Sequence, residues 1–236
     1  MIELKENRKY KIIIVGVGGT GSNLLSPLSR LIQFNNNHKL IIIDGDEYEA
    51  KNKKNQNISN RQIGRAKSEA MAELIQNKYP DVDVIYKDTY ISQEKELLKI
   101  LKGTEIPILV SCVDNNSTRK IFHNVFYDTK VNNIIYIDSG NGTNDRIGQV
   151  IIGFKQYGKI ILNPVGDYFK EITEEEDTVE KATSCAATAH EMPQNIATNY
   201  MASAVLFNCL NNIISFNYII HKSFFDCENG TVESYN

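Results

Sequence analysis

The sequence predicts an α/β fold: a Rossmann-like, doubly wound, mostly parallel sheet with helices on both faces and an antiparallel extension at one edge. Two observations predict it. Short apolar runs alternate with longer helix-forming segments as far as residue 138, which is the pattern of a parallel sheet covered by helices. The first run leads directly into glycine-rich residues 16–21, which suit a tight turn from strand to helix. We therefore expect ligands at the carboxyl edge of the sheet.

The alternation assigns one element to each segment of the first two thirds. The apolar run 11–16 reads as a buried parallel strand, because it is almost entirely isoleucine and valine. The further expected elements are helix 20–34, strand 39–44, helix 64–79, strand 82–87, helix 92–102, strand 106–112, helix 116–128, strand 133–138, and two strands near 147–154 and 158–162.

The pattern changes after Pro164. Residues 164–184 are rich in acidic side chains, which repel one another and have little to bury, so we expect an acidic crossover loop. Pro193 is expected to open a long helix to about residue 214. The spacing of four side chains predicts its apolar face: Ile196, Tyr200, Ala204 and Phe207. Strands at 218–221 and 223–227 are expected to complete the sheet, with Asn229-Gly230 as a turn.

Composition favours one globular unit, 1–236. The chain is 42% hydrophobic and 23% charged, with a net charge of -3, so it does not broadly attract polyanions and a nucleic-acid partner is disfavoured. The charged N-terminus is unlike a signal peptide, and no apolar run reaches the ~20 residues that span a bilayer. We expect a cytoplasmic protein without a membrane partner. Four widely spaced cysteines indicate neither a zinc ribbon nor a disulfide framework.

The glycine-rich turn does not by itself choose between nucleotides. Its glycines let the backbone approach a phosphate at a helix N-terminus. Most such turns bind dinucleotides, so an NAD(P)-dependent oxidoreductase is the first alternative. Asp44, at the end of the second expected strand, could accept hydrogen bonds from the ribose of NAD or of ATP. The choice therefore depends on the polar motifs that follow.

Three later motifs, taken together with this turn, resemble one family. They are Asp44-Gly45-Asp46 leading to Asn52 and Asn55-Gln56, then Gly64-Arg65-Ala66-Lys67, and then Cys112-Val113-Asp114-Asn115. Over roughly its first two thirds, the chain resembles ThiF, MoeB, HesA and the ubiquitin-activating enzymes, which are adenylyltransferases. Tyr136-Ile137-Asp138-Ser139-Gly140-Asn141, followed by Gly148-Gln149-Val150, also resembles the ThiF-like proteins of plasmid PRTRC systems.

The resemblance implies a single ThiF-like adenylation domain that binds ATP and magnesium. Asp114 would hold the metal at the mouth of the sheet, and its alternative role is an N-cap for helix 116–128. Lys67, expected one turn into its helix, would reach the phosphates, and its alternative is a solvated surface lysine. Asn52 could contact ribose or phosphate, or only form a turn. The implied cofactor-binding set is Gly16, Gly18, Gly19, Gly21, Asp44, Asp46, Asn52, Asn55, Gln56, Lys67, Asp114 and Asn115.

Position 55 departs from the family pattern. The family has an arginine there, before the matching Gln56. An arginine would stabilise the negative charge that develops on the phosphate, and Asn55, which is neutral, cannot do so. Either Arg61 or Arg65 compensates, or catalysis is weakened. Homodimers of the family also tend to lend an arginine across their interface from an N-terminal extension, and Arg8 is the candidate here.

Cys185 follows the acidic segment, where relatives carry a reactive cysteine. A thiolate is a good acceptor for an acyl-adenylate, and His190 or a helix N-terminus could lower its pKa. The alternative is a small buried apolar side chain. Cys112 and Cys209 lie in an expected strand and helix, which favours packing over chemistry.

The resulting hypothesis is an enzyme that uses Asp114, Lys67 and Cys185. It would adenylate the C-terminal carboxylate of a small ubiquitin-like or sulfur-carrier protein that ends in glycine, and Cys185 could then take the acyl group as a thioester. A homodimer is expected from the resemblance. Three alternatives stay open: an oxidoreductase, a tRNA-modifying relative that activates a small carboxylate, and a non-catalytic ATP-binding dimer partner.

Overall fold

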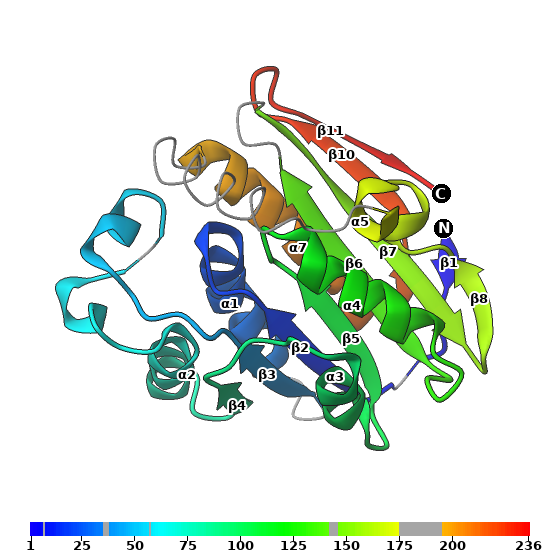
Figure 1. Ribbon diagram of the computed structural model, residues 1–236, viewed down its shortest axis with the longest axis horizontal. Coiled ribbons are helices and arrows are strands. Elements are labelled where there is room, and N and C mark those ends of the chain that lie inside the picture. Colours follow the sequence, from blue (N-terminus) through cyan, green and yellow to red (C-terminus); the bar gives the residue numbers. More distant parts are fainter. Residues whose placement is uncertain (7, 35–37, 57, 142–145, 175–194) are drawn as a thin grey trace.

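The structure, a computed structural model, describes residues 1–6, 8–34, 38–56, 58–141, 146–174 and 195–236 (Figure 1). Within these residues most strands belong to one sheet. They are β2 (Tyr10–Val15), β3 (Lys39–Ile43), β4 (Asp83–Lys87), β5 (Ile106–Ser111), β6 (Ile134–Asn141), β7 (Ile147–Gln156), β8 (Lys159–Leu162), β10 (Lys222–Asp226) and β11 (Thr231–Tyr235).

The sheet has a parallel half and an antiparallel half. Its order is β11-β10-β7-β6-β5-β2-β3-β4, with β8 paired to β7. The pairs among β4, β3, β2, β5 and β6 are parallel, whereas β7 pairs antiparallel with β6, β8 and β10, and β10 with β11. The predicted fold class, including the antiparallel extension, is confirmed.

Helices cover both faces of the sheet (Figure 1). They are α1 (Gly19–Ile32), α2 (Lys67–Lys78), α3 (Glu94–Leu101), α4 (Asn116–Tyr127), α5 (Glu171–Glu174) and α7 (Ile196–Ser215), with short 3-10 helices η1 (Ala50–Lys54), η2 (Asn60–Gln62) and η3 (Val165–Asp167). Since successive residues of a strand point to opposite faces, Ile12 and Ile14 pack with α1, α2 and α7. Ile13 and Val15 pack with α3 and α4 instead, so the central strands are buried on both sides.

Helix α7 corrects the predicted apolar face. Ile196, Tyr200 and Ala204 are exposed. The buried face is made of Thr198, Asn199, Ala202, Ser203, Val205, Leu206, Cys209, Leu210, Asn212 and Ile213. The prediction was wrong because the helix is apolar on more than one side, so spacing alone could not select the face that meets α1. The buried face also carries polar side chains that bond to the glycine turn.

Helix α2 begins later than predicted. The helix expected over 64–79 starts at Lys67, because Gly64 has a positive φ of 78° and Ala66 is extended, with ψ 131°. Lys67 is therefore the first residue of the helix rather than one turn into it. This places its side chain nearer the end of β3 than the sequence suggested.

The end of the chain differs from the prediction in two ways. β9 (Tyr218–Ile219) pairs with β1 (Ile2–Glu3), which was not predicted, in a separate two-stranded sheet, so it does not extend the main sheet. β11, also unpredicted, follows the expected turn, where Gly230 has φ 66°. Its side chains are all exposed, so it lacks the buried apolar alternation that identifies a strand.

The predicted acidic loop begins with ordered structure. η3 and α5 occupy its first part, and Val165 and Ile172 are buried against the α4 face of the sheet. Residues 175–184 lie outside the described residues, so the crossover loop and the single-domain division stay predictions. None of the helices in the described residues has the length and apolar character that a membrane crossing requires.

Core burial predicts that truncation of two isoleucines, one in the central strand β2 and one in the edge strand β4, lowers the free energy of unfolding by very different amounts. Ile14 of β2 is fully buried, whereas Ile85 of the edge strand β4 is 41% exposed. Ile14→Ala should lower the free energy of unfolding by about 2–5 kcal/mol, because it leaves a cavity in the core. Ile85→Ala should change it by less than about 1 kcal/mol. Urea unfolding measures both, and equal losses would contradict this description of the core.

Candidate functional site

The glycine turn after β2 is built by close backbone packing. Gly16 has φ 92°, and its N–H donates to the carbonyl of Ile43 at 2.9 Å. A Cβ at Gly16 would lie 2.6 Å from the carbonyl oxygen of Cys112, and one at Gly21 would lie 2.0 Å from the carbonyl oxygen of Gly16. Both positions therefore require glycine, because any side chain would separate the turn from β5 and α1.

The turn is open on one side and covered on the other. A Cβ at Gly18 would meet no atom within 4 Å, whereas one at Gly19 would meet Asn199 and the Asn55 carbonyl. Gly18 is the N-cap of α1 and offers no side-chain cap, and the first turn of α1 has no acidic residue. The free N–H groups of this helix N-terminus suit an anion such as a phosphate.

Asp44 is held beside the turn by the end of β3. Its carboxylate accepts the N–H of Val17 at 2.5 Å and the N–H of Asp46 at 2.8 Å. Burial raises the pKa of Asp44, while the charge of Lys67 and these two hydrogen bonds oppose the shift. A carboxylate has about four acceptor sites, so Asp44 can still accept hydrogen bonds from a ligand hydroxyl.

Asp46 and Lys67 form an ion pair next to Asp44. The Nζ of Lys67 lies 2.8 Å from the carboxylate of Asp46, which also accepts the hydroxyl of Tyr90. Burial would raise the pKa of Asp46, but the hydrogen bonds from Lys67 and Tyr90 bring it below the ordinary value. Lys67 is buried, so the surface-lysine alternative is wrong. Its ammonium has three donors, which leaves capacity for a phosphate.

Asp114 lies at the same edge of the sheet, two residues after the Cys112 carbonyl that Gly16 contacts. Its carboxylate is exposed, and no hydrogen bond or ion pair engages it within the described part of the chain. The N-cap of α4 is Asn115, whose side chain accepts the N–H of Thr118 at 2.9 Å. The alternative cap role of Asp114 is therefore wrong, and the role expected of Asn115 as a ligand contact competes with capping.

The residues present fit a magnesium ion held jointly with phosphates. Among the described residues, no group of three or more His, Cys, Asp or Glu could hold a metal. Magnesium usually takes only one or two protein carboxylates and completes its shell with substrate phosphates and water. The unpartnered carboxylate of Asp114 beside the open turn matches that donor set.

A buried ion pair, which the sequence analysis missed, supports the Asp114 loop. Arg119 of α4 bonds the carboxylate of Asp138 at 3.2 Å and donates to the carbonyls of Val113 at 2.9 Å and Ser139 at 3.1 Å. Asp138 is 1% exposed. Asp138 directly follows the apolar run Ile134–Ile137, which was the available signal for a buried charge, whereas Arg119 stands among polar residues and gave none. The bond to Val113 fixes the residue immediately before Asp114.

The polar segment after Asp46 lies against the turn through its backbone. The backbone carbonyl of Asn55 would lie 3.1 Å from a Cβ at Gly19, so the residue that departs from the family arginine follows the chain past the glycine turn. The side chain of Asn52 accepts the N–H of Glu49 at 2.8 Å, which is the turn role, and its amide N–H groups remain available. The Oε1 of Gln56 is buried without a partner in the described residues.

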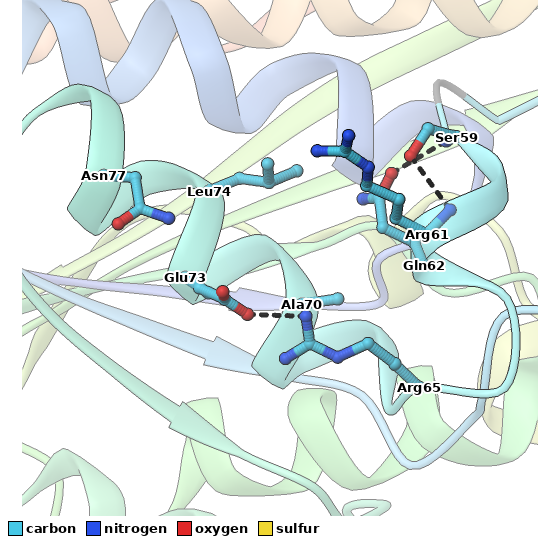
Figure 2. A pocket seen from close by; sticks show the side chains of 8 residues that line it. All are labelled: Ser59, Arg61, Gln62, Arg65, Ala70, Glu73, Leu74 and Asn77. Atoms are coloured by element: carbon cyan, nitrogen blue, oxygen red, sulfur yellow. Dashed lines mark hydrogen bonds and ion pairs between the residues drawn. The ribbon is translucent and has the colours of Figure 1, made fainter.

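Arg61 and Arg65 line a separate pocket of about 270 Å³ between η2 and α2 (Figure 2). The guanidinium of Arg65 lies 2.5 Å from Glu73 and 3.5 Å from Glu69. In Figure 2 both arginine side chains extend toward α2. To supply the positive charge that Asn55 lacks, one of these two arginine side chains would therefore have to leave the pocket and turn away from α2.

Arg8 precedes β2, at the end of the strand opposite the glycine turn. It is therefore far from the turn of its own subunit, and a contribution across a dimer interface stays a prediction. Cys185 and His190 lie outside the described residues. Burial raises the pKa of the Cys112 thiol to about 12, and burial also raises that of Cys209 to about 12, which agrees with packing rather than nucleophilic roles.

Comparison with known sequences identifies a family. A family model described as the ThiF family matches residues 3–213. Ubiquitin-like modifier-activating enzyme 5 of Aedes aegypti is 28% identical over 157 residues, which cover 63% of this chain and 38% of that protein. The protein of the same name from Bombyx mori is 31% identical over 120 residues, which cover 48% of this chain and 30% of that protein.

Solved structures share the fold. A crystal structure of E. coli MccB has a TM-score of 0.65 at 17% identity, covering 96% of this chain and 63% of that one. PaaA has a TM-score of 0.63 at 15% identity, covering 97% and 64%. Other MccB structures contain ATP or MccA. At these identities the likeness establishes the fold, and this chain spans less than two thirds of the length of each of these relatives.

The buried ion pair predicts a stability loss that an exposed pair would not give. Asp138→Asn leaves the Arg119 guanidinium without its counter-charge and should lower the free energy of unfolding by about 3–5 kcal/mol. The control is Asp83→Asn, since Asp83 forms an exposed pair with Lys39 at 3.8 Å and should matter by less than about 1 kcal/mol. Urea unfolding distinguishes them, and a loss at Asp138 no larger than at Asp83 would refute the structural role.

Proposed function

Because the chain belongs to the ThiF family, we propose that it binds magnesium-ATP over the glycine turn and adenylates a carboxylate. The substrate proposed is the C-terminal carboxylate of a small ubiquitin-like or sulfur-carrier protein that ends in glycine. The observation that carries the proposal is the exposed carboxylate of Asp114 beside the open turn, which no described residue engages. Asp44 and Lys67 lie at the same edge.

Each of these side chains has a role that its contacts allow. Asp44 accepts hydrogen bonds from the ribose with the acceptor sites that Val17 and Asp46 leave free. Lys67 donates to the phosphates while one of its N–H groups continues to donate to the carboxylate of Asp46. Asp114 is the protein ligand for magnesium, which when bound neutralises phosphate charge. The N-terminus of α1 supplies further N–H donors.

These residues position the reactants rather than react with them. An oxygen of the carboxylate forms a bond to the α-phosphorus of ATP, and the bond from that phosphorus to the bridging oxygen breaks. Pyrophosphate leaves, and the acyl group remains as an adenylate. Orientation and charge stabilisation supply most of the acceleration in phosphate chemistry of this kind. Cys185 is proposed to take the acyl group next as a thioester, with AMP as the leaving group.

A non-catalytic ATP-binding partner is the second candidate. One observation favours it: the backbone of Asn55 lies next to Gly19, at the position where the family has an arginine, so the site lacks the positive charge that the family carries there in addition to the lysine. This candidate predicts ATP binding without pyrophosphate exchange. The oxidoreductase alternative is less favoured because the ThiF match spans residues 3–213.

Removal of the proposed metal ligand tests the first candidate. Asp114→Ala should weaken magnesium-dependent ATP binding by about 100-fold and abolish ATP-pyrophosphate exchange, because the phosphates lose a charge-neutralising contact. Calorimetry with and without magnesium measures the binding. Asp81→Ala, which removes an exposed aspartate before the amino end of β4, is the control and should bind as the unmodified chain does. Equal binding by both variants would overturn the metal assignment.

Restoring the family arginine tests the consequence of Asn55. Asn55→Arg should bind ATP about tenfold more tightly, because a guanidinium beside Gly19 adds a charge-assisted bond to phosphate. Asn60→Arg introduces the same charge at an exposed position of η2 and should leave the affinity for ATP unchanged. If Asn55→Arg leaves the affinity unchanged, another cation already serves this position.

A further inference from the structure

Asn199 lies in the first turn of α7 and is fully buried against α1. Its Oδ1 accepts the side-chain N–H of Asn141 at 3.0 Å and the hydroxyl of Thr20 at 3.4 Å. Ser203, one turn later, donates to the carbonyl of Thr20 at 2.7 Å. These contacts fix the amide at the glycine turn.

The other end of this amide has no hydrogen-bond partner among the residues that the structure describes. The Nδ2 of Asn199 is buried and makes no hydrogen bond with any described residue. It points at the turn, because a Cβ at Gly19 would lie 2.2 Å from it. Gly19 is the first residue of α1, whose N–H groups face the proposed phosphates. Buried donors are normally paired, so this unpaired one indicates a partner that arrives with the ligand.

We propose that Asn199 donates a hydrogen bond from Nδ2 to a phosphate oxygen of the nucleotide at the glycine turn. The inference rests on the proposed function and adds α7 to the elements that bind ATP. A phosphate oxygen is an acceptor of the right chemistry, and a charged acceptor strengthens the bond. Since α7 follows the segment that contains Cys185, nucleotide binding then also holds the start of this helix in place.

The test replaces the donor with a charge of nearly the same shape. Asn199→Asp keeps an oxygen for Asn141 and Thr20 but presents a carboxylate to the phosphate. Calorimetry with magnesium-ATP at pH 7.5 should show affinity about 100-fold weaker, because like charges meet. The loss should shrink toward pH 5 as the introduced carboxyl takes up a proton, which a purely structural role would not produce.

Asn212→Asp is the matched control. Asn212 is a buried asparagine of the same helix whose Oδ1 accepts the hydroxyl of Tyr218 at 2.8 Å, and its variant should keep ATP affinity within about twofold. Asn199→Ala serves if the charged variant does not fold, and it should lose about tenfold in affinity.

The outcomes separate this inference from the proposed function. Normal ATP binding by Asn199→Asp overturns the phosphate contact and leaves the proposed function intact. If Asn199→Asp does not fold, normal binding by Asn199→Ala has the same meaning. Equal losses in the variants of Asn199 and Asn212 also overturn it, since the effect would then be structural. No ATP binding by the unmodified chain overturns both. Loss confined to the Asn199 variants, with the pH dependence of Asn199→Asp, supports the contact.

Discussion

The approach of the glycine turn to the end of β5 is the constraint on which the site depends. No Cβ fits between Gly16 and the Cys112 carbonyl, or between Gly21 and the Gly16 carbonyl. This contact brings the end of β2 against the end of β5 and sets where α1 begins. As a result, the free N–H groups of α1 and the carboxylate of Asp114 face the same edge of the sheet. Larger residues at either glycine would separate the two halves of the proposed nucleotide site.

A buried ion pair between Arg119 and Asp138 stabilises this edge of the sheet. The Arg119 guanidinium and the Asp138 carboxylate are both largely removed from water, and their pairing offsets a desolvation cost that is large for either ion alone. Arg119 also bonds the Val113 carbonyl, so the ion pair restrains the loop that carries Asp114. The residue before Asp114 is therefore held by a buried side chain, which suits the proposed role of Asp114 as a metal ligand, since a ligand held in place meets phosphates without rearrangement.

The sequence predicted those elements correctly whose hydrophobic pattern allowed a single structural interpretation. The strands β2, β3, β5 and β6 of the parallel half are apolar on both faces, so their runs of isoleucine and valine indicated central strands, and the glycine turn follows the first of them. It failed where two faces of one element were equally apolar. Ile196 and Tyr200 looked like the core of α7, but the face that packs on α1 carries Asn199 and Ser203. Apolar packing of the rest of this face in the core and the hydrogen bonds to Thr20 of α1 hold that orientation, and no local pattern reports either.

The sequence alone determined the fold class, the place of the glycine turn and the family, because these depend on local propensity and on motif spacing along the chain. It also located Asp44, Lys67 and Asp114, since each follows a recognisable strand or glycine. Only the tertiary structure showed that Asn115 rather than Asp114 caps α4, that Lys67 pairs with Asp46, and that Asn199 faces Gly19. The cap is a local contact that the two adjacent polar residues left undecided in the sequence. The other two facts arise from contacts between segments distant in the sequence, and long-range packing fixes them only when the chain folds.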